Sequence, residues 1–137
     1  MNPSTSISTS ISTNTSYENQ TYSGIHMICD IKEIQNMGIL NDISSLKKIL
    51  DIICKKYDFH ILNKIEHAFE PYGSTIIYML SESHISIHTF PEKNYMAFDI
   101  YTCRSYEDNS TYNWIYNYLI ETLDAKLETP TIIQRSF

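Results

Sequence analysis

The spacing of apolar side chains divides most of the chain into short strands and two helices. Loose alternation of apolar and polar residues, or a short run rich in β-branched side chains, predicts a strand. Six segments have such a pattern: residues 24–32, 59–69, 75–80, 85–90, 95–102 and 131–134. Pro71 and Gly73 close the second segment, and a link containing Pro91 joins the fourth to the fifth as in a hairpin.

Two further segments repeat apolar residues at the spacing of an α-helix. The first, residues 43–56, follows Asn41 or Asp42, and either side chain can cap a helix. The second covers residues 111–123. The apolar stripes are Ile43, Leu46, Ile49, Leu50 and Ile53 in the first, and Trp114, Ile115, Tyr118, Leu119 and Leu123 in the second.

The order of these elements is strand, helix, four strands, helix, strand. Consecutive strands favour an antiparallel sheet, and two amphipathic helices are enough to cover one of its faces. A chain of 137 residues is long enough to bury one core and too short for two. We therefore predict one α+β domain over residues 22–137, a two-layer sandwich of an antiparallel sheet and two helices.

Residues 1–21 differ from the rest of the chain in composition. They consist mostly of Ser, Thr, Asn and Ile, as in the run STSISTSISTNTS. Such a segment has little apolar surface to offset the entropy of ordering it. We expect a disordered tail.

Charge and cysteine content narrow the function classes. A net charge of −6 disfavours a nucleic-acid-binding protein, which usually has a basic face. Three scattered cysteines, with no secretory signal ahead of them, favour a reducing compartment. No apolar run approaches the ~20 residues that span a bilayer. The sequence predicts a cytoplasmic protein whose partners include neither a nucleic acid nor a membrane.

Serine, histidine and acidic residues are concentrated in residues 80–92. His84 and His88 are four apart, which would bring two imidazoles together on a helix. The surrounding alternation favours a strand instead, where the two lie ~13 Å apart and cannot share a metal ion. Ser83 or Ser86 as a hydrolase nucleophile lacks the glycine-flanked strand-to-helix turn of that class. An exposed strand face decorated with polar side chains is the simplest remaining interpretation.

The same stretch also carries a specific resemblance. Residues 82–92 read ESHISIHTFPE, and three further motifs flank them in order: GIH at 24–26, HAFEPYG at 67–73 and DIYTC at 99–103. Together these motifs resemble the processing site of the short, prokaryotic-type S-adenosylmethionine decarboxylases. The resemblance covers residues 24–103, and the second predicted helix fits it without a motif of its own.

The resemblance implies an enzyme that cuts its own chain between Glu82 and Ser83. The Ser83 hydroxyl attacks the preceding carbonyl to give an ester, and elimination across the serine then breaks the chain and leaves a pyruvoyl group. The products are a β chain of residues 1–82 and an α chain of residues 83–137. A ketone of this kind forms a Schiff base with the substrate amine and takes up the electrons left when carbon dioxide departs, which no side chain can do.

Five further residues match positions that have roles in the family. His88 matches the residue that assists in breaking the ester, and Thr75 stands where the family has a serine near the scissile bond. Cys103 matches the general acid that protonates the decarboxylated carbon. Phe69 and Glu92 match the residues that hold the nucleoside, by stacking on adenine and by accepting the ribose hydroxyls. The implied substrate is S-adenosylmethionine, and the implied product is an aminopropyl donor for spermidine and other polyamines.

Spacing along the strand at the cleavage site adds an expectation about assembly. Ser83 and His88 differ by five positions, so an unbent strand points them to opposite faces. One protomer supplies both only if the chain bends at the cleavage point. A dimer with shared sites, which the resemblance also implies, removes the conflict. The expected division is Ser83 and Cys103 from one protomer, with His88, Thr75, Phe69 and Glu92 from the other.

One alternative concerns the substrate. Arg104 follows Cys103 where the family usually has glycine, and it could oppose a sulfonium cation or bind a substrate carboxylate. Some similar proteins decarboxylate ornithine or arginine. An adenine platform at Phe69 and a ribose-binding carboxylate at Glu92 favour S-adenosylmethionine, because an enzyme for free basic amino acids has less use for them.

A second alternative is an unprocessed, non-catalytic homologue that regulates a partner. Such a chain is expected to lack the Glu82–Ser83 pair, His88 or Cys103. All four residues are present.

Overall fold

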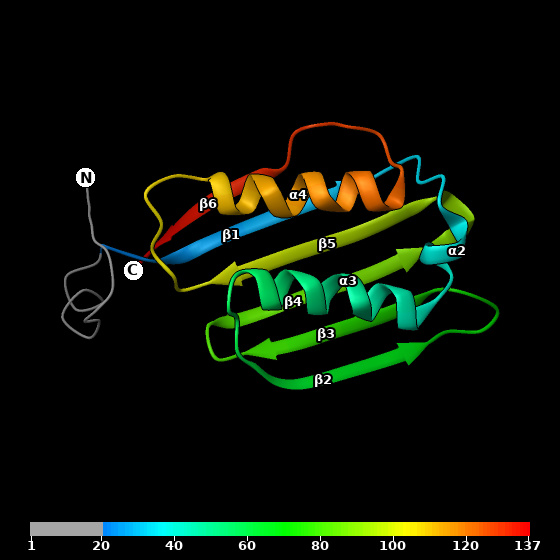
Figure 1. Cartoon of the computed structure of the whole chain (residues 1–137), viewed down its shortest axis with the longest axis horizontal. Coiled ribbons are helices and arrows are strands. Elements are labelled where there is room, and N and C mark those ends of the chain that lie inside the picture. The colour runs from blue at the N-terminus through cyan, green and yellow to red at the C-terminus, as the bar shows by residue number, and fades with distance from the viewer. Residues whose placement is uncertain (1–20) are drawn as a thin grey trace.

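Six antiparallel strands form one sheet in the computed structural model, which describes residues 21–137 (Figure 1). The order across the sheet is β2-β3-β4-β5-β1-β6. The strands are β1 (Tyr22–Ile31), β2 (Ile61–Ala68), β3 (Ser74–Leu80), β4 (Ser83–Phe90), β5 (Tyr95–Thr102) and β6 (Thr131–Ser136). The α+β sandwich is as predicted, and each of the six predicted strands is present, with ends that differ from the predicted ones by at most two residues. The expected tail lies outside the described residues, apart from Thr21.

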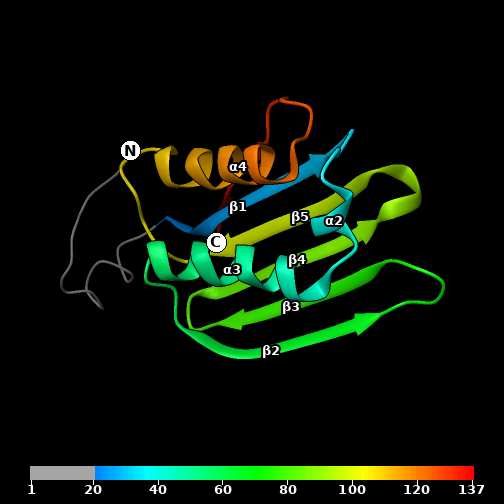
Figure 2. The ribbon, with the colours of Figure 1, turned by 45° about the vertical axis from the view of Figure 1, so that its right-hand side comes forward.

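Two long helices, α3 (Ile43–Lys56) and α4 (Ser110–Leu123), lie on the same face of the sheet (Figure 2). α3 begins after Asp42, whose carboxylate accepts a hydrogen bond from the Ser45 N–H at 3.0 Å. This cap satisfies an N–H that the first turn leaves without a partner. The predicted start and end of α3 are confirmed, and α4 begins one residue before the predicted range.

Two one-turn elements are absent from the prediction. They are α2 (Met37–Leu40) and the 3₁₀ turn η1 (Pro91–Lys93), which forms the link between β4 and β5. Each is too short to repeat an apolar position, so periodicity gives no signal for it.

Alternation along the central strands builds the core between sheet and helices. The helix-side residues of β3, β4 and β5 are buried: Ile76, Tyr78, Leu80, Ile85, Ile87, Met96, Phe98 and Ile100. Burying one such side chain contributes ~1.5–3 kcal/mol. A one-residue slip would turn all of them to the opposite face, so the core fixes the strand register.

The other face of the sheet is not covered by any helix of residues 21–137 (Figures 1 and 2). It carries a row of polar side chains together with exposed apolar ones, among them Ile28, Ile65 and Met79, which are 39%, 56% and 50% exposed. None of the helices in the described part of the chain is long and apolar enough to cross a membrane.

Candidate active site

The bond predicted to be cut lies at the tip of the β3–β4 hairpin. Ser81 and Glu82 form the two-residue turn, and Leu80 and Ser83 are the first pair of the ladder. Ser83 has φ 149°, in a region that residues with a Cβ rarely adopt and that costs ~1–3 kcal/mol. The residue on the C-terminal side of the bond is therefore held in a strained backbone conformation.

The backbone at the end of β5 and just after it is hydrogen-bonded to the same turn. Ser83 pairs with Thr102, and the N–H of Cys103 donates a hydrogen bond to the Glu82 carbonyl oxygen at 3.0 Å. The structure thus brings Ser83 and Cys103 together in one chain. It also places a hydrogen-bond donor on the carbonyl that Ser83 would attack.

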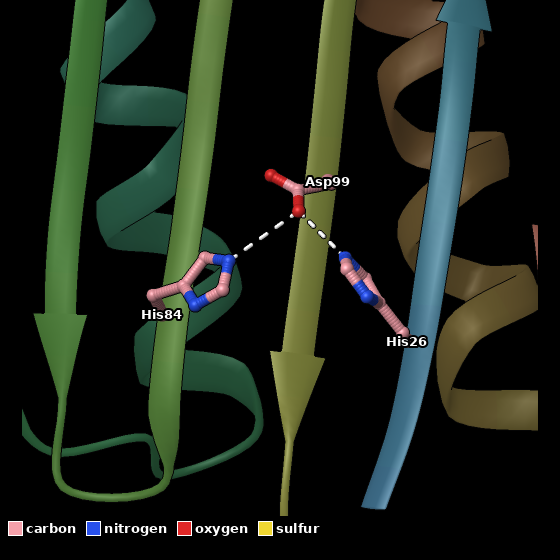
Figure 3. A group of neighbouring side chains, drawn as sticks. All are labelled: His26, His84 and Asp99. Carbon is pink, nitrogen blue, oxygen red and sulfur yellow. Dashed lines mark hydrogen bonds and ion pairs between the residues drawn. The ribbon is translucent and has the colours of Figure 1, made fainter. Parts of the chain in front are cut away.

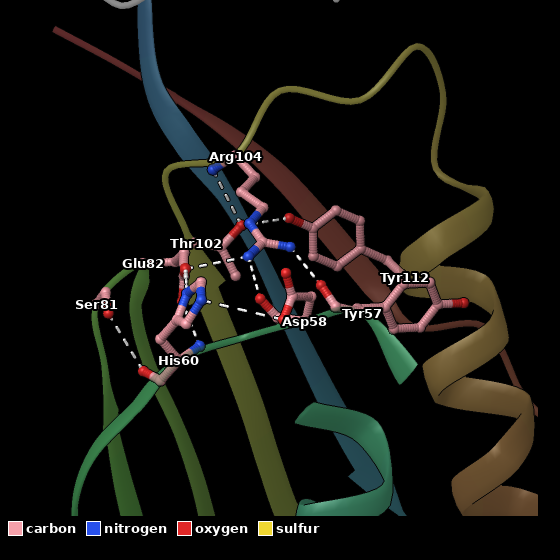
Figure 4. Close-up of polar contacts among 8 residues, drawn as sticks. All are labelled: Tyr57, Asp58, His60, Ser81, Glu82, Thr102, Arg104 and Tyr112. Atoms are coloured by element: carbon pink, nitrogen blue, oxygen red, sulfur yellow. Dashed lines mark hydrogen bonds and ion pairs between the residues drawn. The ribbon is translucent and has the colours of Figure 1, made fainter. Parts of the chain in front are cut away.

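His60 and Arg104 both contact the Glu82 carboxylate (Figure 4). Its Oε1 accepts the N–H of His60 at 3.0 Å, and its Oε2 accepts His60 Nδ1 at 2.9 Å and Arg104 Nη2 at 3.0 Å. Burial alone would raise the pKa of the Glu82 carboxyl, but these hydrogen bonds outweigh it and lower the pKa. The same carboxylate raises the pKa of the exposed His60 imidazole.

Arg104 connects this carboxylate to the end of helix α3. Its guanidinium donates to the backbone carbonyls of Tyr57 and Asp58 and lies over the ring of Phe59, 4.7 Å from the centroid. These contacts leave it directed at Glu82 and at the chain that follows α3. Sequence reasoning singled out Arg104 for its position beside Cys103 but missed His60, because only the folded chain brings residues 60, 82 and 104 together.

A second group of predicted site residues lies toward the other end of the hairpin. Thr75 and His88 face each other in the ladder, and Thr75 Oγ1 is hydrogen-bonded to His88 Nδ1 at 3.0 Å. His67 pairs with Thr75, and its ring contacts that of Phe69 at 4.6 Å between centroids. Phe69 is 50% exposed. Glu92 lies in η1 and is exposed.

The two groups do not meet within one chain. Ser83 and His88 are five positions apart along β4, which at ~3.4 Å per residue is ~17 Å. His88 lies on the uncovered face, whereas Ser83 shares the register parity of the helix-side Ile85. The structure therefore brings Ser83 near Cys103, and His88 near Thr75, at separate positions.

His84 makes a contact that its spacing from His88 does not indicate (Figure 3). On the uncovered face, Asp99 Oδ2 lies 2.6 Å from His26 Nε2 and 3.3 Å from His84 Nε2, and Oδ1 is bonded to the Ser86 hydroxyl. This cluster lies in a depression of about 500 Å³. Positions 26, 84 and 99 belong to three strands, so only the register of the sheet reveals them.

These three side chains are the one group in residues 21–137 with three histidine, cysteine or acidic ligand atoms close enough to hold a metal ion. Asp99 has both oxygens engaged, and burial, which raises its pKa, is outweighed by the bonds from Ser86 and the two imidazoles, so its pKa is lowered. Arg135 Nη1 lies 3.5 Å from His26 Nδ1. The two imidazoles, Asp99, Ser86 and Arg135 form one connected hydrogen-bond network on the uncovered face.

Comparison with known proteins decides the family. Residues 25–136 match the family model described as S-adenosylmethionine decarboxylase. The chain belongs to the S-adenosylmethionine decarboxylase family. The S-adenosylmethionine decarboxylase proenzyme of Sulfurihydrogenibium sp. is 34% identical over 112 residues, which are 82% of this chain and 81% of that protein. The family resemblance inferred from the motifs is confirmed.

Two further matches agree with this family assignment. S-adenosylmethionine decarboxylase proenzyme 2 of Bacillus cereus is 41% identical over 80 residues, 58% of this chain. That match spans 64% of the length of the Bacillus cereus protein. The crystal structure of the adenosylmethionine decarboxylase from Aquifex aeolicus superimposes with a TM-score of 0.73 at 25% identity, over 86% of this chain and 94% of that one. The family's fold thus extends through the α4 region, where no motif was found.

Proposed function

We propose that this chain is a pyruvoyl-dependent S-adenosylmethionine decarboxylase that cuts itself between Glu82 and Ser83. The observation that carries the proposal is the hairpin tip. There a serine with a strained backbone follows a carbonyl that already accepts a hydrogen bond from the Cys103 N–H. Membership of the family and the name proenzyme given to its relatives agree with self-processing.

The cleavage begins as an acyl shift from nitrogen to oxygen. Ser83 Oγ attacks the Glu82 carbonyl carbon, and negative charge develops on the oxygen that the Cys103 N–H contacts. The C–N bond then breaks, which leaves Glu82 as an ester on Oγ and frees the Ser83 amine. Strain at Ser83 is released in this step, because its φ is no longer fixed by a peptide bond.

Elimination completes the cleavage. Loss of the Ser83 Cα proton breaks the Oγ–Cβ bond and releases Glu82 as a carboxylate at the end of residues 1–82. The enamine left on residue 83 becomes an imine, and water replaces its nitrogen as ammonia. The resulting pyruvoyl group would supply an electron sink for decarboxylation. Its position beside Cys103 fits a thiol that returns a proton to the substrate carbon.

We also propose a dimer in which each site is shared. The ~17 Å between Ser83 and His88 supports this proposal. A two-fold axis can bring the tip of one hairpin to the opposite end of its partner's hairpin, here called the open end, where Thr75 and His88 lie. The uncovered sheet face, with exposed Ile28, Ile65 and Met79, is the surface we assign to the contact between protomers.

The scattered cysteines support a location in the cytoplasm.

The substrate assignment rests on the open end of the hairpin. The half-exposed ring of Phe69 is available for stacking on adenine, and the exposed carboxylate of Glu92 is available for ribose hydroxyls. Arg104 is already engaged by Tyr57, Asp58 and Glu82. It is therefore not the carboxylate-binding group that an ornithine or arginine decarboxylase would require at this position.

Intact-mass analysis of the purified protein tests the proposal. We expect two chains, residues 1–82 and 83–137, the second starting with pyruvoyl. A Ser83→Ala variant should remain one chain, while the control Ser81→Ala, on the other side of the turn, should still be cut. A single uncut parent chain, or turnover of ornithine or arginine in place of S-adenosylmethionine, would contradict the assignment.

A further inference from the structure

The Glu82 side chain is held more firmly than a turn residue requires. It is the residue before the bond proposed to be cut, and it stands at a hairpin tip, where a carboxylate ordinarily extends into water. Its side chain is only 11% exposed. Two separate segments, at His60 and at Arg104, direct hydrogen-bond donors at it (Figure 4).

Arg104 is itself anchored. Its guanidinium donates to the carbonyls of Tyr57 and Asp58, and its own N–H donates to the Thr102 hydroxyl at 3.2 Å. Carbonyls at a helix C-terminus lack intrahelical donors and carry partial negative charge, so a guanidinium is stabilised there. The position of Arg104 is therefore set by helix α3 and not by Glu82 alone.

Consecutive residues then hold both polar ends of Glu82. The N–H of Cys103 contacts its main-chain carbonyl at 3.0 Å, and Arg104 contacts its carboxylate at 3.0 Å. Rotation of the peptide plane after Glu82 would break the backbone hydrogen bond from Cys103, and displacement of residue 82 would also break the charged hydrogen bond from Arg104. The side-chain contact thus helps to hold residue 82, and with it the carbonyl to be attacked, against the Cys103 N–H.

We propose that Arg104, assisted by His60, is a positioning residue for self-cleavage: it clamps the Glu82 carboxylate so that the scissile carbonyl stays on the Cys103 N–H. This inference rests on the proposed cleavage at Glu82–Ser83. The clamp acts through Glu82 and does not touch the reacting hydroxyl. After cleavage, it keeps the new end of the β chain in place beside Cys103.

The rate of self-cleavage in a cell-free synthesis reaction, followed by denaturing electrophoresis, tests the clamp. Misplacing a reacting group by about 1 Å can cost up to about 100-fold in rate, so we expect Arg104→Ala to slow cleavage about 10- to 100-fold. Arg104→Lys keeps the charge and should recover part of the rate. The matched control is Lys47→Ala, which removes a cation paired with Glu66, away from the tip.

A double-variant comparison separates a clamp from a general effect on folding. Glu82→Gln keeps the shape of the side chain and removes its charge, so it should slow cleavage as Arg104→Ala does. Because both changes break one interaction, the double variant should be about as slow as either single variant.

Two outcomes overturn the inference while leaving the proposed function intact. One is a parent chain that is cut and an Arg104→Ala chain that is cut equally fast. The other is a double variant whose slowing is the product of the two single effects, since that shows independent roles. An uncut parent chain is a different result, because it overturns the proposed function and this inference together.

Discussion

The two ends of the β3–β4 hairpin differ in how tightly their polar groups are held. At the tip, the carbonyl and the carboxylate of Glu82 have bonding partners from two separate segments, and the carboxylate is 11% exposed. At the open end, the Phe69 ring is 50% exposed and Glu92 lies on a surface turn. Tight holding suits chemistry within the chain, and exposed groups suit an incoming ligand. The two ends of the hairpin thus differ in the kind of contact that they offer.

The largest expected effect tests whether the two ends belong to different protomers of one site. Ser83→Ala and His88→Ala chains should each be inactive alone. When the two are co-expressed, random pairing puts an intact site in about half of the dimers, which restores about a quarter of the parent activity. Turnover of S-adenosylmethionine by the co-purified mixture measures this.

The control for this test uses two residues of the same end. Ser83→Ala mixed with Cys103→Ala should not recover turnover, because every shared site then lacks one of the two. If neither mixture regains activity although the dimers form, each site lies within a single chain and the proposed division is wrong.

A second prediction separates the backbone of Cys103 from its side chain. Cys103→Ala keeps the N–H that contacts the Glu82 carbonyl, so the chain should still be cut. It lacks the proposed proton donor, and turnover should fall about 100-fold or more. Mass analysis measures the extent of cleavage, and a carbon dioxide assay measures the turnover rate. A variant that stays uncut would mean that the Cys103 thiol is required for processing and not only for decarboxylation.

The fold could be predicted because its strands repeat with period two and its helices with period 3.6. Residues 95–102 alternate without interruption, and the predicted strand has the bounds of β5. Asp42 at the start of an apolar stripe gave the first turn of α3. The start of β4 at Ser83 was missed by two residues, because Ser83 and His84 are both polar and half-buried and give no alternation to read.

The polar networks could not be predicted, because each depends on register. His60, Glu82 and Arg104 come from a loop, a turn and the segment after β5, and Asp99 meets its two imidazoles from adjacent strands. A motif gives the order of residue types along the chain but does not say which residues are neighbours across strands. The motifs therefore indicated the proposed cleavage point and the proposed reacting residues, while the groups around them are found only from the sheet.

A third prediction addresses the open end and is smaller. Phe69→Ala removes the proposed stacking surface, and a lost base–aromatic contact of ~1–3 kcal/mol raises KM by about 5- to 150-fold. Cleavage should proceed at the parent rate, because the role proposed for Phe69 is in substrate binding and not in processing. Phe69→Tyr, which keeps an aromatic face, is the matched control. An unchanged KM with Phe69→Ala would place adenine elsewhere.

The smallest effect concerns the charge state of the tip. His60 has a pKa above its ordinary 6.5 because of its hydrogen bond with Glu82, and the pKa of Glu82 lies below 4.5. The groups facing His60 are Glu82, Arg104 and Asp58, whose Oδ1 is 4.0 Å from Nε2. The His60 contribution to stability is complete below pH 6.5 and is lost as pH rises through the raised pKa. The Glu82 contribution is complete above pH 4.5 and is lost as pH falls through the lowered one.

The ion pair at the tip is therefore fully formed between about pH 4.5 and 6.5. The uncut Ser83→Ala chain is compared with and without His60→Asn, since asparagine keeps a donor but carries no charge. Within this window the Asn variant should have a Tm lower by about a degree, because His60 is exposed to screening. The difference should shrink as pH rises above the window. A Tm difference that grows in alkaline solution would mean that the neutral imidazole of His60 stabilises the tip and that its charge does not.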